Sequence, residues 1–123
     1  MFTTLHSFSS ANGGGLGGLV QGNDGNLYGT TSDGYGTVYQ ITTNGAFTTL
    51  HTFNGADGST PYAALIQGSD GNFYGTTDGG GPNGWYGTVF QITTNGTFTT
   101  LQAFSGSDSA AHPQCFYRIM LMP

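Results

Sequence analysis

The stretch Gln21-Gly22-Asn23-Asp24-Gly25-Asn26-Leu27-Tyr28-Gly29-Thr30-Thr31 decides the fold, because it returns with few changes at residues 67–77. Two other stretches recur in step with it. Residues 36–45 return at 87–96, and residues 2–8 return at 47–53 and again at 98–104. A chain that repeats itself about every 45–50 residues is expected to fold as an array of similar units.

Each unit predicts four short β-strands. Thr, Val, Ile, Phe and Tyr favour strands, whereas Asp-Gly and Asn-Gly pairs favour hairpin turns because glycine accepts a positive φ. The predicted strands are residues 16–23, 27–31, 36–42 and 46–53 in the first unit, and 63–69, 73–77, 87–93 and 97–104 in the second. A four-stranded antiparallel meander of this length is typical of one blade of a β-propeller. A solenoid or an open sandwich is the structural alternative.

The predicted fold class is therefore all-β, with two full blades per chain and an N-terminal outer strand. Residues 1–8 are expected to be the outer strand of an incomplete blade, 9–53 the first blade and 54–104 the second. Residues 105–123 begin a further repeat, but from Cys115 onward they depart from its pattern. Either a reading-frame change or an apolar interface strand accounts for that tail.

Two blades cannot close a ring, since propellers use about four or more. Repeat units also need neighbours on both sides to cover their apolar faces. We therefore expect a homo-oligomer in which several copies close one ring, with residues 2–8 able to complete a sheet in a neighbour. A filament is the alternative if the exchange does not close.

Charge narrows the range of partners. The 123 residues include six acidic side chains and one basic one, for a net charge of −5. Nucleic acids and anionic membrane surfaces are recognised by Lys and Arg, so neither is an expected partner. No apolar stretch is long enough to span a bilayer, so membrane insertion is not expected. A single cysteine provides no internal disulfide.

No catalytic residue is predicted. His6 and His51 occupy the same repeat position, which Gln102 fills in the third copy, so a structural strand contact explains them better than catalysis. Asp24 and Asp70 are explained as turn residues beside glycine. A propeller enzyme of the lyase or lactonase type is an alternative that would need inward-facing acids or histidines.

A binding face is predicted where the loop between the second and third strands meets the connection between blades. Trp85, Tyr86, Tyr35 and Asn83 are the candidate ligand-binding residues there, since exposed aromatic rings suit stacking on sugars. Asp57, Asp78 and Asp33 are candidates for holding calcium, the one cofactor considered. Packing of Trp85 between blades is the alternative. Gly13–Gly15 and Gly79–Gly81 are expected to be flexible connectors.

These repeats resemble a named family. Tyr-Gly-Thr-Thr at 74–77, Gly-Gly at 79–80, Gly-Thr-Val-Phe-Gln-Ile-Thr at 87–93 and Leu-His-Ser-Phe at 5–8 look like the bacterial GloVer tandem repeat, over residues 2–114. The resemblance implies a propeller-like fold and an exported or cell-surface protein of the choice-of-anchor kind. It supplies no substrate and no catalytic residue. No signal peptide opens the chain, so we expect any export signal to lie outside it.

The predicted function is a non-catalytic, self-assembling repeat module of an extracellular or cell-surface bacterial protein. Three alternatives stay open: a carbohydrate-binding or adhesive module, a propeller enzyme, and a filament-forming structural protein. A glycan is the specific ligand class that Trp85 and Tyr86 indicate, because they lie in a loop rich in Asp, Asn and Gly.

Overall fold

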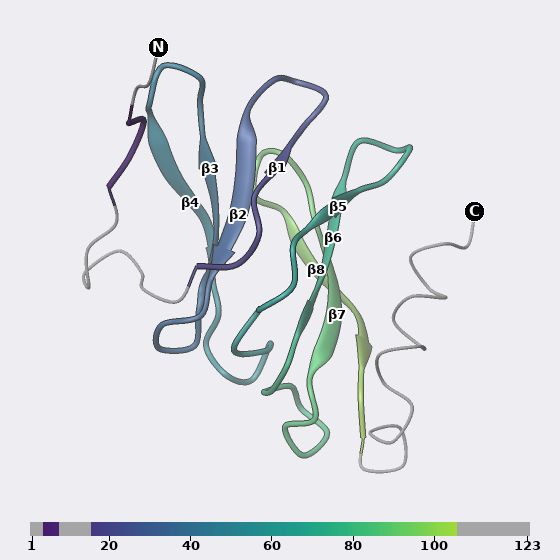
Figure 1. The fold of residues 1–123 in the computed structure, drawn as a ribbon. Helices are drawn as coiled ribbons and strands as arrows, with labels where there is room; N and C mark the ends of the chain where they lie inside the picture. Colours follow the sequence, from purple (N-terminus) through teal and green to yellow (C-terminus); the bar gives the residue numbers. More distant parts are fainter. Residues whose placement is uncertain (1–3, 8–15, 106–123) are drawn as a thin grey trace.

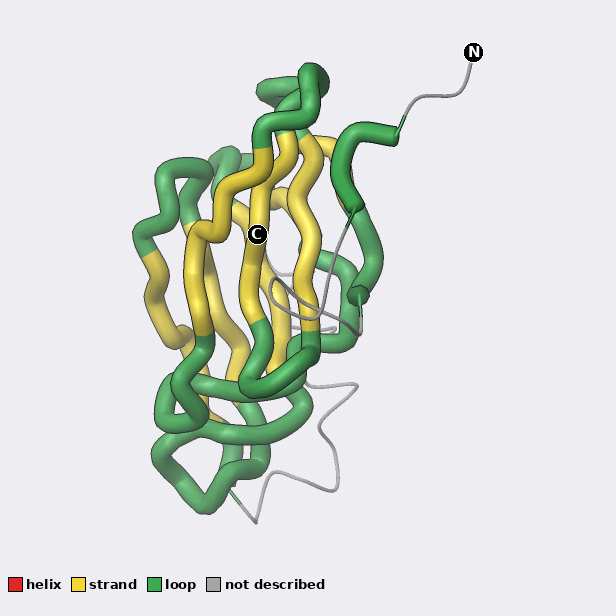
Figure 2. Tube along the Cα trace, turned by 90° about the vertical axis from the view of Figure 1, so that its left-hand side faces the viewer, coloured by secondary structure: helices red, strands yellow, loops and turns green. Residues whose placement is uncertain are grey.

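A computed structural model, which describes residues 4–7 and 16–105, contains two four-stranded antiparallel sheets (Figure 1). The first sheet has the order β1 (Val20–Gln21), β2 (Leu27–Thr31), β3 (Thr37–Ile41), β4 (Phe47–Thr52). The second has the order β5 (Ile66–Gln67), β6 (Phe73–Thr77), β7 (Thr88–Ile92), β8 (Phe98–Ala103). Over these residues Figure 2 shows strands and loops alone, so the predicted all-β class is confirmed, and the sheets are consistent with two blades. The described residues include no helix long and apolar enough to cross a membrane.

The strands match the prediction best in the middle of each sheet. β2 and β6 begin and end at the predicted residues, whereas β1 and β5 are much shorter than the expected 16–23 and 63–69. Glycine weakens a strand, and the segment before β1 is glycine-rich. Gly18 is required there by close packing, because a Cβ on it would lie 2.7 Å from the Cβ of Ala64. Small residues thus allow the segments that precede β1 and β5 to lie close together.

β4 and β8, which we call the outer strands, carry a bulge at the same repeat position. The pairing of β3 with β4 shifts between Val38 and Tyr39, and the pairing of β7 with β8 shifts between Val89 and Phe90. An extra residue in one strand changes which side its later side chains face. The bulge therefore explains why apolar and polar residues alternate imperfectly in the sequence of the outer strands.

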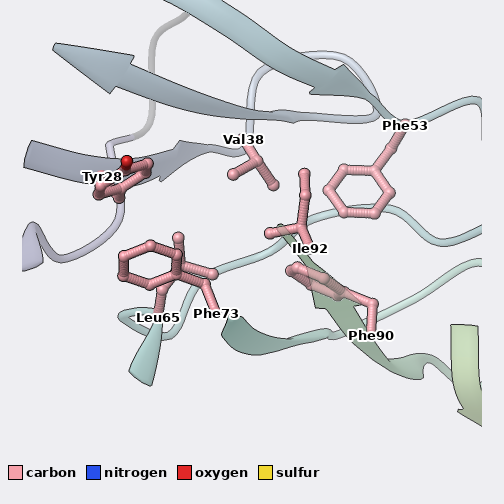
Figure 3. Packing of buried hydrophobic residues seen from close by; sticks show 7 residues of the cluster. All are labelled: Tyr28, Val38, Phe53, Leu65, Phe73, Phe90 and Ile92. Atoms are coloured by element: carbon pink, nitrogen blue, oxygen red, sulfur yellow. The ribbon is translucent and has the colours of Figure 1, made fainter. Parts of the chain in front are cut away.

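The hydrophobic core lies between the two sheets (Figure 3). We call the side of the first sheet that bears Tyr28, Val38 and Phe53 its leading face, and the side of the second sheet that bears Phe73, Phe90 and Ile92 its trailing face. The leading face of the first sheet packs on the trailing face of the second, with Leu65 beside them.

Aromatic rings join the two faces. The rings of Tyr28 and Phe73 have centroids 4.1 Å apart, and those of Phe53 and Phe90 are 5.3 Å apart in an edge-on arrangement. All seven residues of this cluster are at most 2% exposed. Because the cluster combines side chains from both sheets, each sheet depends on the other for burial of its apolar surface.

Candidate functional site

Two exposed aromatic side chains meet at one end of the sheets. The β2–β3 loop, the β6–β7 loop and the connection from β4 to β5 all lie at that end, at the bottom of Figure 1. The backbone N–H of Thr60 donates to the carbonyl of Tyr35 at 2.9 Å, which ties the connection to the β2–β3 loop. The rings of Tyr35 and Trp85 have centroids 6.2 Å apart and are tilted by 53°. Tyr35 is 50% and Trp85 53% exposed, so part of each ring is open to a ligand.

Gly55 supports this aromatic pair. A Cβ on Gly55 would lie 2.6 Å from Cη2 of Trp85 and 3.1 Å from Cε1 of Tyr35, so both rings rest close to its backbone. Trp85 itself has a φ of 69°, a conformation that bulky residues adopt at a cost of about 1–3 kcal/mol. The surrounding loop must therefore hold Trp85 in place.

The glycines of the β6–β7 loop provide that support. The N–H of Ser59 donates to the carbonyl of Gly79 at 2.9 Å, and the N–H of Gly81 donates to that of Gly55 at 2.8 Å. A Cβ on Gly80 would lie 2.5 Å from the carbonyl carbon of Gly58. The expectation that Gly79–Gly81 form a flexible connector was therefore wrong, because the missing side chains allow close backbone packing. Residues 13–15 lie outside the described residues.

The other two predicted ligand-binding residues make different contacts. Tyr86 is 46% exposed and its backbone bridges to Gly80. The side-chain amide of Asn83 donates to the carbonyl of Ala103 at 3.3 Å, which directs it to the end of β8. Among the four candidate ligand-binding residues, Tyr35 and Trp85 are the pair whose rings lie in contact.

The three predicted calcium-binding carboxylates occupy separate places. Oδ1 of Asp57 accepts a bond from the N–H of Asn54, and its Oδ2 lies 2.9 Å from Nε2 of His51. Asp33 and Asp78 are exposed in the β2–β3 and β6–β7 loops. Among residues 4–7 and 16–105, no group of three or more His, Cys, Asp or Glu side chains could hold a metal ion. Calcium binding therefore stays a prediction, because the three carboxylates do not form a cluster in this part of the chain.

Histidine–phenylalanine stacks recur along the array. The rings of His51 on β4 and Phe98 on β8 are 3.8 Å apart and parallel to within 1°. The rings of His6 and Phe47 are 4.2 Å apart and parallel to within 8°. The first stack joins the two sheets, and the second joins residues 4–7 to the first sheet. The sequence reasoning treated both histidines as strand contacts but missed their aromatic partners, although Phe47 and Phe98 share a repeat position.

A tyrosine–carboxylate network also recurs in each sheet. The hydroxyl of Tyr28 donates to Asp24 at 2.5 Å and accepts a bond from the amide of Gln40 at 2.9 Å. In the second sheet Tyr74, Asp70 and Gln91 make the same bonds at 2.6 Å and 3.0 Å. The aspartates therefore do more than shape the turns, and the repeated Asp-Gly-Asn-x-Tyr spacing carries the signal for this network.

The network changes proton affinity in both sheets. Burial, followed by the bond to Asp24, raises the pKa of Tyr28 above its ordinary value. The bond to Asp70 is the main cause that raises the pKa of Tyr74, and the same bond lowers the pKa of Asp70. The neutral form is therefore favoured for both tyrosines, and the ionised form is favoured for Asp70.

Two equivalent sheets, with matching turns, bulges and side-chain networks, define an all-β tandem-repeat protein. A family model described as the Gloeobacter/Verrucomicrobia repeat matches residues 1–116, and the chain belongs to this family. The resemblance inferred from the repeats is thereby confirmed. No curated protein and no solved structure matches the chain.

Proposed function

We propose that this chain is a non-catalytic repeat module that assembles with copies of itself by stacking one sheet on the next. The contact between the two sheets within the chain supports the proposal. The leading face of the first sheet is built from residues that recur, as identical or related types, on the second sheet. The pairs at equivalent repeat positions are Tyr28 and Tyr74, Val38 and Val89, and Phe53 and Phe104.

Exposure along β8 indicates where a further sheet would pack, whereas Val89 and Phe104 on the same face are already buried. On β4, Leu50 and His51 are half-buried against the second sheet. Their equivalents on β8 are exposed: Leu101 to 45%, with Gln102 beside it. Stacking of a second copy on β8 would cover this apolar surface as the second sheet covers β4.

The proposed contact is head-to-tail, because the leading face of the second sheet would meet the trailing face of the first sheet of another copy. On the first sheet this trailing face bears Tyr39 and Ile41, which occupy the repeat positions of Phe90 and Ile92. A contact between two different surfaces closes a ring if the rotation allows and otherwise continues as a filament.

We propose a non-catalytic role because the His and Asp side chains that could serve in catalysis make structural contacts. His51 and Asp57 bind each other, and Asp24 and Asp70 hold tyrosine hydroxyls. Structural contacts therefore account for these groups. An extracellular or cell-surface setting stays a prediction from the family resemblance.

The test is the solution mass of the chain measured by light scattering over a range of concentrations. We expect association that Leu101→Asp abolishes, because a carboxylate would be buried at the copy-to-copy contact. Thr94→Asp is the matched control, since it adds the same charge at an exposed hairpin turn. A strict monomer at all concentrations would contradict self-assembly.

A second candidate function is binding of neutral saccharides at Tyr35 and Trp85. The exposed, tilted rings held over Gly55 favour it, because aromatic faces stack on the apolar faces of sugars. Neutral ligands are favoured because residues 4–7 and 16–105 contain no Lys or Arg.

Calorimetric titration with soluble β-glucan, mannan and chitin oligosaccharides tests this candidate. Binding should disappear in Trp85→Ala and persist in Tyr62→Ala, which removes an aromatic ring that is 63% exposed elsewhere. If no oligosaccharide releases or absorbs heat with the unmodified chain, the aromatic pair has another role.

A further inference from the structure

Residues 4–7 lie on the first sheet as β4 lies on the second. The carbonyl oxygen of Leu5 is 3.0 Å from the Cβ position of Gly45, and that of Leu50 is 3.1 Å from the Cβ position of Gly96. The histidine stacks agree, since His6 covers Phe47 in the way that His51 covers Phe98. Two independent contacts therefore place residues 4–7 where the outer strand of a preceding sheet would lie.

Head-to-tail stacking requires another strand, β8 of a second copy, to lie where residues 4–7 lie on the first sheet. In that arrangement, which rests on the function proposed above, β8 of one copy must approach Phe47 of the next copy. It must do so as β4 approaches Phe98 within one chain. Residues 4–7 of the second copy already hold that position, so the two segments cannot occupy it together.

We propose that residues 4–7 are an internal cap, and that the surface formed by Gly45 and Phe47 is an acceptor for β8 of a second copy. The cap must leave this acceptor before two copies can stack. Association is then a competition between a segment of the same chain and a strand of another.

The side chain at the repeat position of His51 biases this competition toward the cap. The cap presents His6, whose flat ring stacks on Phe47, whereas β8 presents Gln102, which has no ring. An aromatic pair is worth about 0.5–1.5 kcal/mol beyond its buried area, which corresponds to a factor of about 2–12 in an equilibrium constant. Exchanging the two residue types should shift the competition by about that factor at each site.

The experiment uses the full chain with His6→Gln, Gln102→His and both changes together. Both residue types already occur at this repeat position, so the variants should fold, and circular dichroism checks that they do. Sedimentation analysis then gives the association constant of each variant. Thr100→His is the control, because it adds an imidazole to the same strand at an exposed residue paired with Phe90, on the other side of the bulge from Gln102.

We expect each single change to strengthen association about 2- to 12-fold, the double change to do so further, and the control to have no effect. Association that neither His6→Gln nor Gln102→His alters would overturn the cap and leave self-assembly standing. A monomeric unmodified chain whose double variant associates would support the cap and acceptor, but would contradict assembly of the unmodified chain. If all variants stay monomeric, both proposals fail.

Discussion

Replacing Phe90 by alanine should destabilise both sheets at once. Phe90 is fully buried, its ring lies 5.3 Å from that of Phe53 and 5.4 Å from that of Phe98, and its tip covers Gly75. Truncation therefore opens a cavity at the contact between the sheets. Changes of Phe to Ala in protein cores cost about 3–5 kcal/mol, while whole domains are stable by about 5–15 kcal/mol. We expect Phe90→Ala to remove about a fifth or more of the free energy of unfolding.

Urea unfolding followed by two probes measures this effect. Far-UV circular dichroism reports on all strands, and the emission of the single tryptophan, Trp85, reports on the β6–β7 loop. Both probes should shift to the same lower midpoint, because the two sheets share one core. Tyr62→Ala is the control and should change stability by at most about 0.5 kcal/mol, since this ring is 63% exposed. A loss below about 1 kcal/mol, or two separate transitions, would refute a shared core.

Three further outcomes are expected. Tyr28→Phe should lower the free energy of unfolding in urea by about 1.5–3 kcal/mol, because a buried hydroxyl bonded to a carboxylate is lost. The same change at Tyr74 should cost less, because Tyr74 is less buried, and equal losses would contradict this. Gly36→Ala should lower the melting temperature more than Gly34→Ala. Both glycines have a positive φ, but a Cβ on Gly36 would lie 2.5 Å from Pro61, whereas a Cβ on Gly34 would meet open space. The raised pKa of Tyr28 adds stability that is fully present below its ordinary value of 10.0 and is lost as the pH rises through the raised value. The free energy of unfolding should therefore fall above about pH 10, and fall less steeply in Tyr28→Phe; identical slopes would exclude this tyrosine as a source.

Local sequence signals predicted the sheets well. β2 and β6 were placed to the residue because each follows an Asp-Gly-Asn turn, and Gly25 and Gly71 have the positive φ that such a turn needs. The short inner strands and the bulges depend on how neighbouring strands and sheets pack. A pattern of residue types along one strand does not contain that information.

The candidate site was predictable only in part. The meander placed Tyr35 and Trp85 at one end of the sheets, and the structure brings their rings together. The positive φ of Trp85 and the bond from Asn83 to the end of β8 arise from packing of the glycine loop on the connection after β4. The His51–Phe98 stack joins residues far apart in the chain, so its alignment became visible only with both sheets in place.

The β2–β3 and β6–β7 loops differ in length but end at the same anchor. Gly36 and Gly87 have φ values of 98° and 100°, and each accepts a 2.9 Å bond from the N–H of the phenylalanine that follows the outer strand. The ladder beyond each anchor opens with a Thr–Thr pair in both repeats, so the inserted residues leave the strand register untouched. Foreign peptide segments can therefore be grafted between Gly81 and Gly87 while the β-scaffold beneath them keeps its geometry, because Gly79–Gly81 would retain their backbone bonds to the connection after β4.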